Sequence, residues 1–234
     1  MTSATPTALE RRPRLLVFDV NETLSDMTHL GDRFVEIGVP PYLAAPWFAG
    51  LLRDGFALTV TGRNAAFADV ARSSLHTVLH DKANVEAATR HIMAGFLALP
   101  LHDDVPGGVR ALRALGLRLV TLSNGSSDVA EGLFERGGIR EAFERVLSVE
   151  DAPAWKPAAS AYAYALGECG VAAEEAMLVA VHPWDVHGAK AAGLRAAWID
   201  RTGAPYPDTM YAADVVARSL LDLAAQLEAV PADA

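Results

Sequence analysis

The chain has 234 residues, 51% hydrophobic and 21% charged, a composition that excludes a disordered chain or a collagen-like repeat. Its 29 acidic and 20 basic residues leave a net charge of −9, which disfavours nucleic acid or an anionic membrane surface as the main partner. The single Cys169 permits no intrachain disulfide or multi-cysteine zinc site, and the N-terminal sequence is polar, so we expect a soluble cytoplasmic protein.

Short runs of branched apolar residues recur along the chain and predict the buried strands of a parallel sheet. Helical stretches separate most of them. This alternation predicts a doubly wound, Rossmann-like α/β fold. The predicted strands cover residues 14–20, 117–123, 145–149, 176–182 and 194–200.

Residues 28–103 differ from the rest, because their apolar residues recur at helical spacing and few runs resemble strands. They predict an all-helical insertion. Because the insertion follows the acidic end of the first strand, it would cover the carboxyl edge of the sheet as a cap, where ligands bind in such folds. The predicted organisation is an α/β core over 12–27 and 104–228, a helical cap over 28–103 and a flexible tail over 229–234.

Polar segments stand at the ends of the predicted strands, where a parallel sheet brings side chains to one edge. The segments are FDVNETL (18–24), LSNGS (122–126), WKP (155–157) and VHPWDVHGA (181–189). Together they supply an acid after the first strand and another after a later strand, a hydroxyl with an amide, and one of only three lysines, which are the components of a site with a carboxylate nucleophile. Taken singly, each also has a structural explanation, such as a helix cap, a turn or ordinary packing.

The four segments, in this order, resemble those of the haloacid dehalogenase superfamily, and within it the type II 2-haloacid dehalogenases. The resemblance implies that Asp19 is the nucleophile and forms an aspartyl intermediate, with Thr23 orienting its carboxylate. It also implies that Lys156 keeps Asp19 ionised, since a nearby cation lowers the pKa of a carboxyl. Asp185 would steady Lys156 and help to activate the hydrolytic water, and a homodimer is expected on the resemblance alone.

Ser123 and Asn124 would, by the same resemblance, act in catalysis by hydrogen-bonding the substrate's carboxylate or phosphate and the leaving group. The substrate itself would be a small anionic molecule. The full set of expected substrate contacts is Val20, Asn21, Ser123, Asn124, Trp47, Tyr162, His182 and Trp184.

Asn21, two residues after the nucleophile, separates two activities. Phosphatases of the superfamily hold a second Asp there, which protonates the leaving group. A halide is a very weak base and leaves without a proton, and the segment 181–189 has one acid where those phosphatases usually show two that hold Mg²⁺. We therefore expect a 2-haloacid dehalogenase that needs no metal or other cofactor, with a Mg²⁺-dependent phosphatase or a catalytically silent protein as the alternatives.

Two features depart from the dehalogenase pattern. Those enzymes carry an Arg early in the cap to receive the halide, whereas residues 38–48 contain none, which leaves Arg53 or Arg63 as substitutes. They also have Ser and Asn where this chain has Ala180 and His182. His182 either accepts a proton or hydrogen-bonds the water or halide, or it simply fills the strand end, and both the functional and the structural interpretation stay open.

Overall fold

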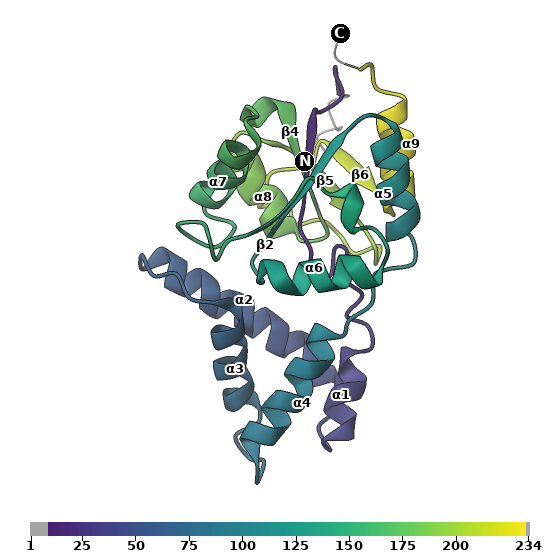
Figure 1. The fold of residues 1–234 in the computed structure, drawn as a ribbon. Helices are drawn as coiled ribbons and strands as arrows, with labels where there is room; N and C mark the ends of the chain where they lie inside the picture. The colour runs from purple at the N-terminus through teal and green to yellow at the C-terminus, as the bar shows by residue number, and fades with distance from the viewer. Residues whose placement is uncertain (1–8, 233–234) are drawn as a thin grey trace.

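A parallel sheet of six strands, in the order β3-β2-β1-β4-β5-β6, forms the centre of the computed structural model, which describes residues 9–232 (Figure 1). The chain builds outward from β1 to one edge, crosses back, and builds to the other edge, so the predicted doubly wound fold is confirmed. Residues 1–8 of the polar N-terminal sequence and residues 233–234 of the predicted tail lie outside the described residues. The strands are β1 (Leu15–Phe18), β2 (Arg118–Ser123), β3 (Arg145–Ser148), β4 (Ala176–Ala180), β5 (Arg195–Ile199) and β6 (Val215–Ala217).

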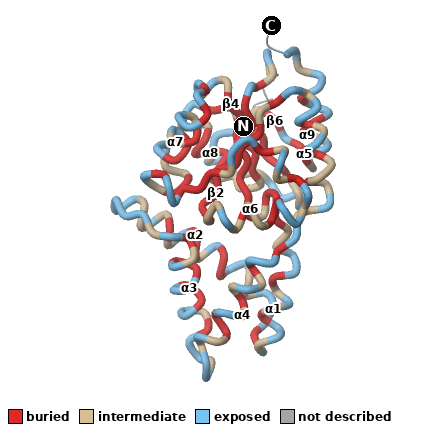
Figure 2. The backbone as a smooth tube through the Cα atoms, in the orientation of Figure 1, coloured by how far each residue is buried: buried red, intermediate tan, exposed pale blue. Residues whose placement is uncertain are grey.

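Helices cover both faces of the sheet, and alternate residues of each strand point into one or the other layer. In β1, Leu15 and Val17 pack in the layer that contains α7 and α8, whereas Leu16 and Phe18 pack against α5, α6 and α9. The buried residues are concentrated along the strands (Figure 2). The helices are α5 (Val105–Ala114), α6 (Ser127–Arg136), α7 (Ala159–Cys169), α8 (Pro183–Ala191) and α9 (Leu220–Glu228).

Four further helices lie together on one side of this core, below it in Figure 1. Aromatic rings fill the space between them, and the ring of Trp47 meets those of Phe34, Phe48 and Phe96 at centroid distances of 6.1–6.3 Å. No helix of the described residues is both long and apolar enough to cross a membrane. The four helices are α1 (Leu30–Glu36), α2 (Ala44–Val60), α3 (Phe67–Val78) and α4 (Val85–Leu97), and the short 3-10 helix η1 (Pro41–Leu43) precedes α2.

Trp155 joins these four helices to the core. Its ring stacks on Phe67 at 5.8 Å, and its indole N–H donates to the carbonyl of Ala65 at 2.9 Å. Gly55 of α2 lies against the same ring, and a Cβ built on it would stand 2.3 Å from a ring carbon. A larger residue at this point would therefore push the helix away from the core.

The last described residues are held by Arg12. Its backbone N–H donates to the carbonyl of Pro231 at 2.9 Å, and its guanidinium donates to the carbonyls of Leu227, Glu228 and Val230. Up to Pro231, then, the segment predicted as a tail has defined hydrogen-bond partners.

Candidate active site

The polar residues singled out in the sequence come from separate elements that end at one edge of the sheet. Asp19 directly follows β1, Ser123 ends β2, Lys156 lies between β3 and α7, and Asp185 lies in the first turn of α8. Parallel strands bring these positions together because all their carboxyl ends point the same way.

Lys156 stands between two carboxylates. Its Nζ lies 2.9 Å from Oδ1 of Asp19 and 2.6 Å from Oδ2 of Asp185, and all three side chains are almost completely buried. A buried charge without a partner is strongly unfavourable, so each of these groups depends on the others to remain ionised.

Neighbouring hydroxyl groups complete this cluster. Thr23 Oγ1 donates to Oδ2 of Asp19 at 2.6 Å and accepts from the backbone N–H of Val181 at 3.1 Å. Tyr162 donates its hydroxyl to Oδ1 of Asp185 at 2.6 Å. Both oxygens of Asp185 are therefore engaged, which orients this carboxylate toward Lys156.

Burial and charge act in opposite directions on these groups. Burial disfavours the Asp19 carboxylate, but the ammonium of Lys156 and the hydrogen bonds from His182 and Thr23 outweigh it and hold the pKa of Asp19 below its usual value. Burial also opposes protonation of Lys156, yet the charges of Asp185 and Asp19 keep its pKa raised. Asp185 differs, because burial dominates and raises its pKa. At neutral pH Asp19 is thus an ionised carboxylate in a water-poor site, as a nucleophile requires.

His182 links Asp19 to a residue that the sequence did not suggest. Its Nδ1 lies 3.2 Å from Oδ2 of Asp19, and its Nε2 lies 2.8 Å from Oε2 of Glu22. Burial lowers the proton affinity of the ring, but the hydrogen bonds to the two carboxylates prevail and raise the pKa of His182 to about 9. Trp184 stacks on this imidazole at 5.1 Å.

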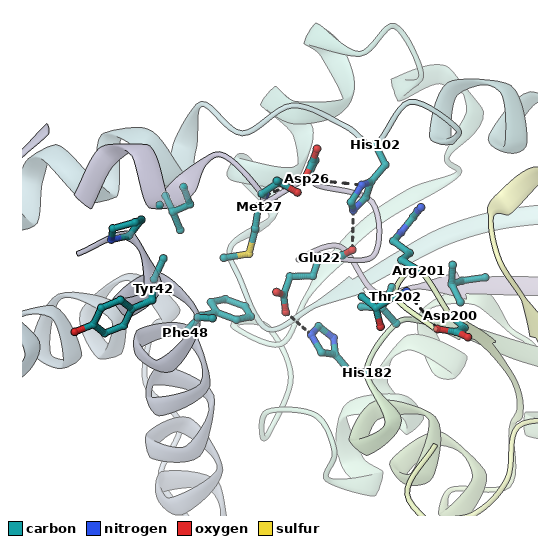
Figure 3. Close-up of a pocket in the computed structure, with 18 of the residues that line it drawn as sticks. Glu22, Asp26, Met27, Tyr42, Phe48, His102, His182, Asp200, Arg201 and Thr202 are labelled. Carbon is teal, nitrogen blue, oxygen red and sulfur yellow. Dashed lines mark hydrogen bonds and ion pairs between the residues drawn. The ribbon is translucent and has the colours of Figure 1, made fainter. Parts of the chain in front are cut away.

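Two cavities are lined by residues next to the cluster. A small one of about 40 Å³ is lined by Val20, Asn21 and Ser123 from the core and by Phe67 and other apolar residues of α3 and α4. Glu22 and His182, whose ring contacts Asp19, line a second, wider and open cavity of about 950 Å³ (Figure 3). The cluster around Asp19 is therefore bordered by a confined, mainly apolar space and by a space open to solvent.

Some predicted contacts lie elsewhere. Trp47 is only 1% exposed and packs inside the four-helix group, so it does not reach the cluster. Asn124 is close by, but its side chain accepts from the backbone N–H of Lys156 at 3.0 Å and donates to the carbonyl of Lys156 at 3.2 Å, which fixes the loop that carries the lysine. The Arg53 side chain is 76% exposed and pairs with Asp54, and Arg63 is exposed as well. Neither arginine reaches the small cavity.

Glu22 was missed although it lies within the segment FDVNETL. Its backbone has φ 62°, a left-handed conformation that a residue with a Cβ rarely adopts. This turn directs its side chain to His182. The one available signal was an acid three residues after the nucleophile in the same turn.

Comparison with known proteins agrees with this geometry. The family model of haloacid dehalogenase-like hydrolases matches residues 13–193, which is more than half of the chain. The chain belongs to this family. Among its relatives, haloacetate dehalogenase H-2 of Moraxella sp. (strain B) is 39% identical over 120 residues, an alignment that spans 50% of this chain and only 53% of that protein.

Other members of the family match over most of their length. The (S)-2-haloacid dehalogenase of Pseudomonas sp. (strain YL) is 29% identical over 80% of this chain and 83% of its own. The solved structure of the L-2-haloacid dehalogenase RSc1362 superposes with a TM-score of 0.86 at 26% identity and covers 93% of this chain and all of that one. The similarity to the family thus extends over the core and the four-helix group.

Proposed function

We propose that the protein is a 2-haloacid dehalogenase, which hydrolyses a small 2-haloacid to a 2-hydroxy acid. The observation that carries the proposal is the ionised, buried carboxylate of Asp19, held by Lys156 beside a small and mainly apolar cavity. A carboxylate removed from water is a stronger nucleophile, and an apolar wall suits the carbon that it attacks. The names of the relatives support the same activity.

The first step would form an ester. An oxygen of Asp19 attacks C2 of the substrate, the carbon–halogen bond breaks, and the halide leaves with the bonding electron pair. No proton is needed for this departure. This agrees with the neutral amide of Asn21, which stands two residues after the nucleophile. Thr23 and Lys156 would hold the carboxylate in line for the attack.

The second step would regenerate the enzyme. Water adds to Cγ of the Asp19 ester, and the bond from Cγ to the substrate-bound oxygen breaks. The product leaves with that oxygen as its hydroxyl group, one proton of the water passes to the product, and the other is released to solvent. The oxygen of the water stays in the carboxylate of Asp19.

The small cavity suggests a short substrate. About 40 Å³ holds only a few heavy atoms, since a single water needs about 10–15 Å³ on this measure. Ser123 and the first residues of α6 border the cavity, where the hydroxyl and free backbone N–H groups can receive the substrate's carboxylate. We therefore propose a two-carbon haloacid as the preferred substrate, with Val20, Asn21, Tyr162, His182 and Trp184 around the reacting groups.

A halide-release assay tests the proposal. The purified protein is incubated with chloro-, bromo- and fluoroacetate and with both enantiomers of 2-chloropropionate, with Asp19→Asn as the control. We expect halide from the haloacetates, slower release from the larger acids, and none from the variant. In a single turnover in ¹⁸O-water, the label should enter Asp19 and not the first product. Label in the first product would contradict the ester mechanism.

The phosphatase alternative fits the site less well. Magnesium would need several oxygen ligands near Asp19 and Asp185, but the ammonium of Lys156 lies between these two carboxylates at 2.9 and 2.6 Å. A divalent cation there would face a fixed positive charge. Phosphate release that stops on addition of a chelator, with no halide release, would nevertheless favour that alternative.

Three broader proposals accompany this function. The four helices α1–α4 act as the cap over the site, which is supported by their position beside the carboxyl ends of the strands (Figure 1). A cytoplasmic location is supported by the single cysteine. A homodimer is supported by the family resemblance, and light scattering of the purified protein would test it.

A further inference from the structure

His182 has a carboxylate on each ring nitrogen. Nδ1 lies 3.2 Å from Asp19 and Nε2 lies 2.8 Å from Glu22, and a carboxylate can only accept a hydrogen bond. Both nitrogens must therefore carry a proton, so the ring is an imidazolium that donates in both directions. The imidazolium therefore places a positive charge beside Oδ2 of Asp19, whereas Lys156 contacts Oδ1.

Glu22 is held firmly in this position. Its backbone N–H donates to Ser25 Oγ at 3.2 Å, and the ring of His102 hydrogen-bonds its carbonyl at 3.0 Å. These contacts maintain a left-handed backbone that is unfavourable for glutamate. Glu22 thus keeps an unfavourable backbone conformation in which its side chain contacts His182, and this points to a function for that contact.

The two oxygens of Asp19 have different surroundings. Within residues 9–232, Lys156 is the only donor to Oδ1, whereas Oδ2 receives hydrogen bonds from both Thr23 and His182. The less solvated oxygen is the better nucleophile, so Oδ1 would attack the substrate. Oδ2 then becomes the carbonyl oxygen of the ester and remains beside its two donors.

We propose that His182 is the oxyanion donor for hydrolysis of the aspartyl ester, and that Glu22 is a positioning residue that keeps His182 protonated during that step. The inference rests on the proposed dehalogenase function. When water adds to Cγ, the negative charge develops on Oδ2, and the Nδ1–H of His182 and the hydroxyl of Thr23 stabilise it. An electron pair on Oδ2 re-forms the double bond to Cγ as the bond from Cγ to Oδ1 breaks; the product alkoxide takes one proton of the added water, and the other is released to solvent.

His182 needs a second carboxylate beside it because Asp19 loses its charge when the ester forms. Formation of the ester removes the charge of Asp19, which is one of the two groups that raise the pKa of His182 to about 9 in the free enzyme. Glu22 takes no part in the reaction and retains its charge. It can therefore hold the imidazolium in place when the first partner becomes neutral.

Other groups around His182 do not replace Glu22. Lys156 lies 6.0 Å from the ring of Trp184, which stacks on His182, and its positive charge would oppose protonation. Asp185 is engaged by Lys156 and Tyr162. His102 contacts the backbone carbonyl of Glu22 and not its side chain. The carboxylate of Glu22 is thus the one unreacting anion in direct contact with His182 among the described residues.

The wide cavity beside this pair gives it access to solvent. Glu22 and His182 line the open space of about 950 Å³ (Figure 3), whereas Val20 and Ser123 line the small cavity. Water can therefore approach the ester from the His182 side while the substrate occupies the small cavity.

Pre-steady-state measurements with chloroacetate test the proposal. Halide release reports ester formation, and intact-protein mass spectrometry reports the amount of carboxymethyl adduct on the enzyme. His182→Ala should release one equivalent of halide rapidly and then accumulate the adduct, with ester hydrolysis slowed by about 100-fold or more, as for loss of one oxyanion donor. His182→Asn should recover part of that rate, because the amide nitrogen of Asn occupies the position of Nδ1 and can donate without a charge.

The pH dependence isolates the role of Glu22. Ester hydrolysis in the wild type should fall at alkaline pH as His182 loses its proton. In Glu22→Gln that fall should begin at lower pH, and in His182→Asn it should be absent. A merely structural role for His182 or Glu22 would not shift a pH limit in the second step alone.

The outcomes separate this proposal from the one on which it rests. Rapid adduct hydrolysis in His182→Ala, or an unshifted alkaline limit in Glu22→Gln, would overturn the assignment of these two residues while leaving the dehalogenase function intact. Absence of both halide and adduct with the wild-type protein would instead overturn the dehalogenase function.

Discussion

Replacing Lys156 with Met tests whether this side chain holds the buried charges together. Methionine has a similar length but no charge, so Asp19 and Asp185 would lose the cation that lies between them. The ammonium lies 2.9 and 2.6 Å from the two carboxylates, and the three side chains are at most 5% exposed. Removing one partner from a buried ion pair typically costs about 3–5 kcal/mol, a large part of the roughly 5–15 kcal/mol by which proteins are stable.

The effect should depend on pH. In the wild type the pKa of Asp19 is depressed on folding, so its contribution to stability is present above the ordinary carboxyl pKa and is lost as the pH falls through the depressed value. In Lys156→Met a carboxyl would instead have a raised pKa in the folded state, which disfavours folding increasingly as the pH rises above about 4. The difference in unfolding free energy between variant and wild type should therefore be largest at neutral pH and shrink on acidification.

Urea unfolding followed by tryptophan fluorescence, at pH 7.5 and pH 5, measures this difference. Lys190→Met is the matched control, because Lys190 pairs with Asp214 at 2.6 Å but both side chains remain partly exposed, and its loss should cost about 1 kcal/mol or less. Adding Asp185→Asn to Lys156→Met should recover part of the stability by removing one buried charge. Equal losses for both lysine variants, independent of pH, would refute the reasoning.

Three further changes probe the surroundings of the site. Gly55→Ala should lower the unfolding free energy by about 1–3 kcal/mol in the same urea assay, because the new Cβ would overlap the ring of Trp155; an unchanged midpoint would contradict that close approach. Tyr162→Phe should cost about 1–3 kcal/mol, since a buried oxygen of Asp185 loses its donor, and calorimetry of the variant checks this. Arg53→Ala should leave the rate of halide release unchanged, because this side chain is exposed; a large loss of activity would restore it as a halide ligand.

Much of the core could be predicted from the sequence, because strands buried on both faces give continuous apolar runs. The strands β1 to β5 lie within one or two residues of the predicted ranges. The strand β6 was missed because it has only three residues and exposes Val216. The helix α1 lies inside the insertion that was predicted to be helical, although it has only seven residues and His29 provides no capping side chain at its start.

The sequence predicted which residues of the site come together, because the topology of the parallel sheet alone determines that. Polar residues after parallel strands must meet, and Asp19, Lys156 and Asp185 do. The orientation of a side chain within a loop does not follow from topology, so the hydrogen bonds of Asn124 to Lys156 could not be foreseen. Nor does helical spacing tell which partner a buried aromatic residue faces, which is why Trp47 was assigned to the wrong surroundings.

Trp155 and Lys156 are consecutive residues with different environments. The indole is enclosed by α2, α3 and the segment between them, while the next side chain neutralises Asp19. A displacement of the four helices relative to the sheet would therefore pull on the backbone that carries the counter-ion of the nucleophile. The two parts of the molecule are thereby coupled in one cooperative unit, in which an ordered helical group and an ionised nucleophile stabilise each other.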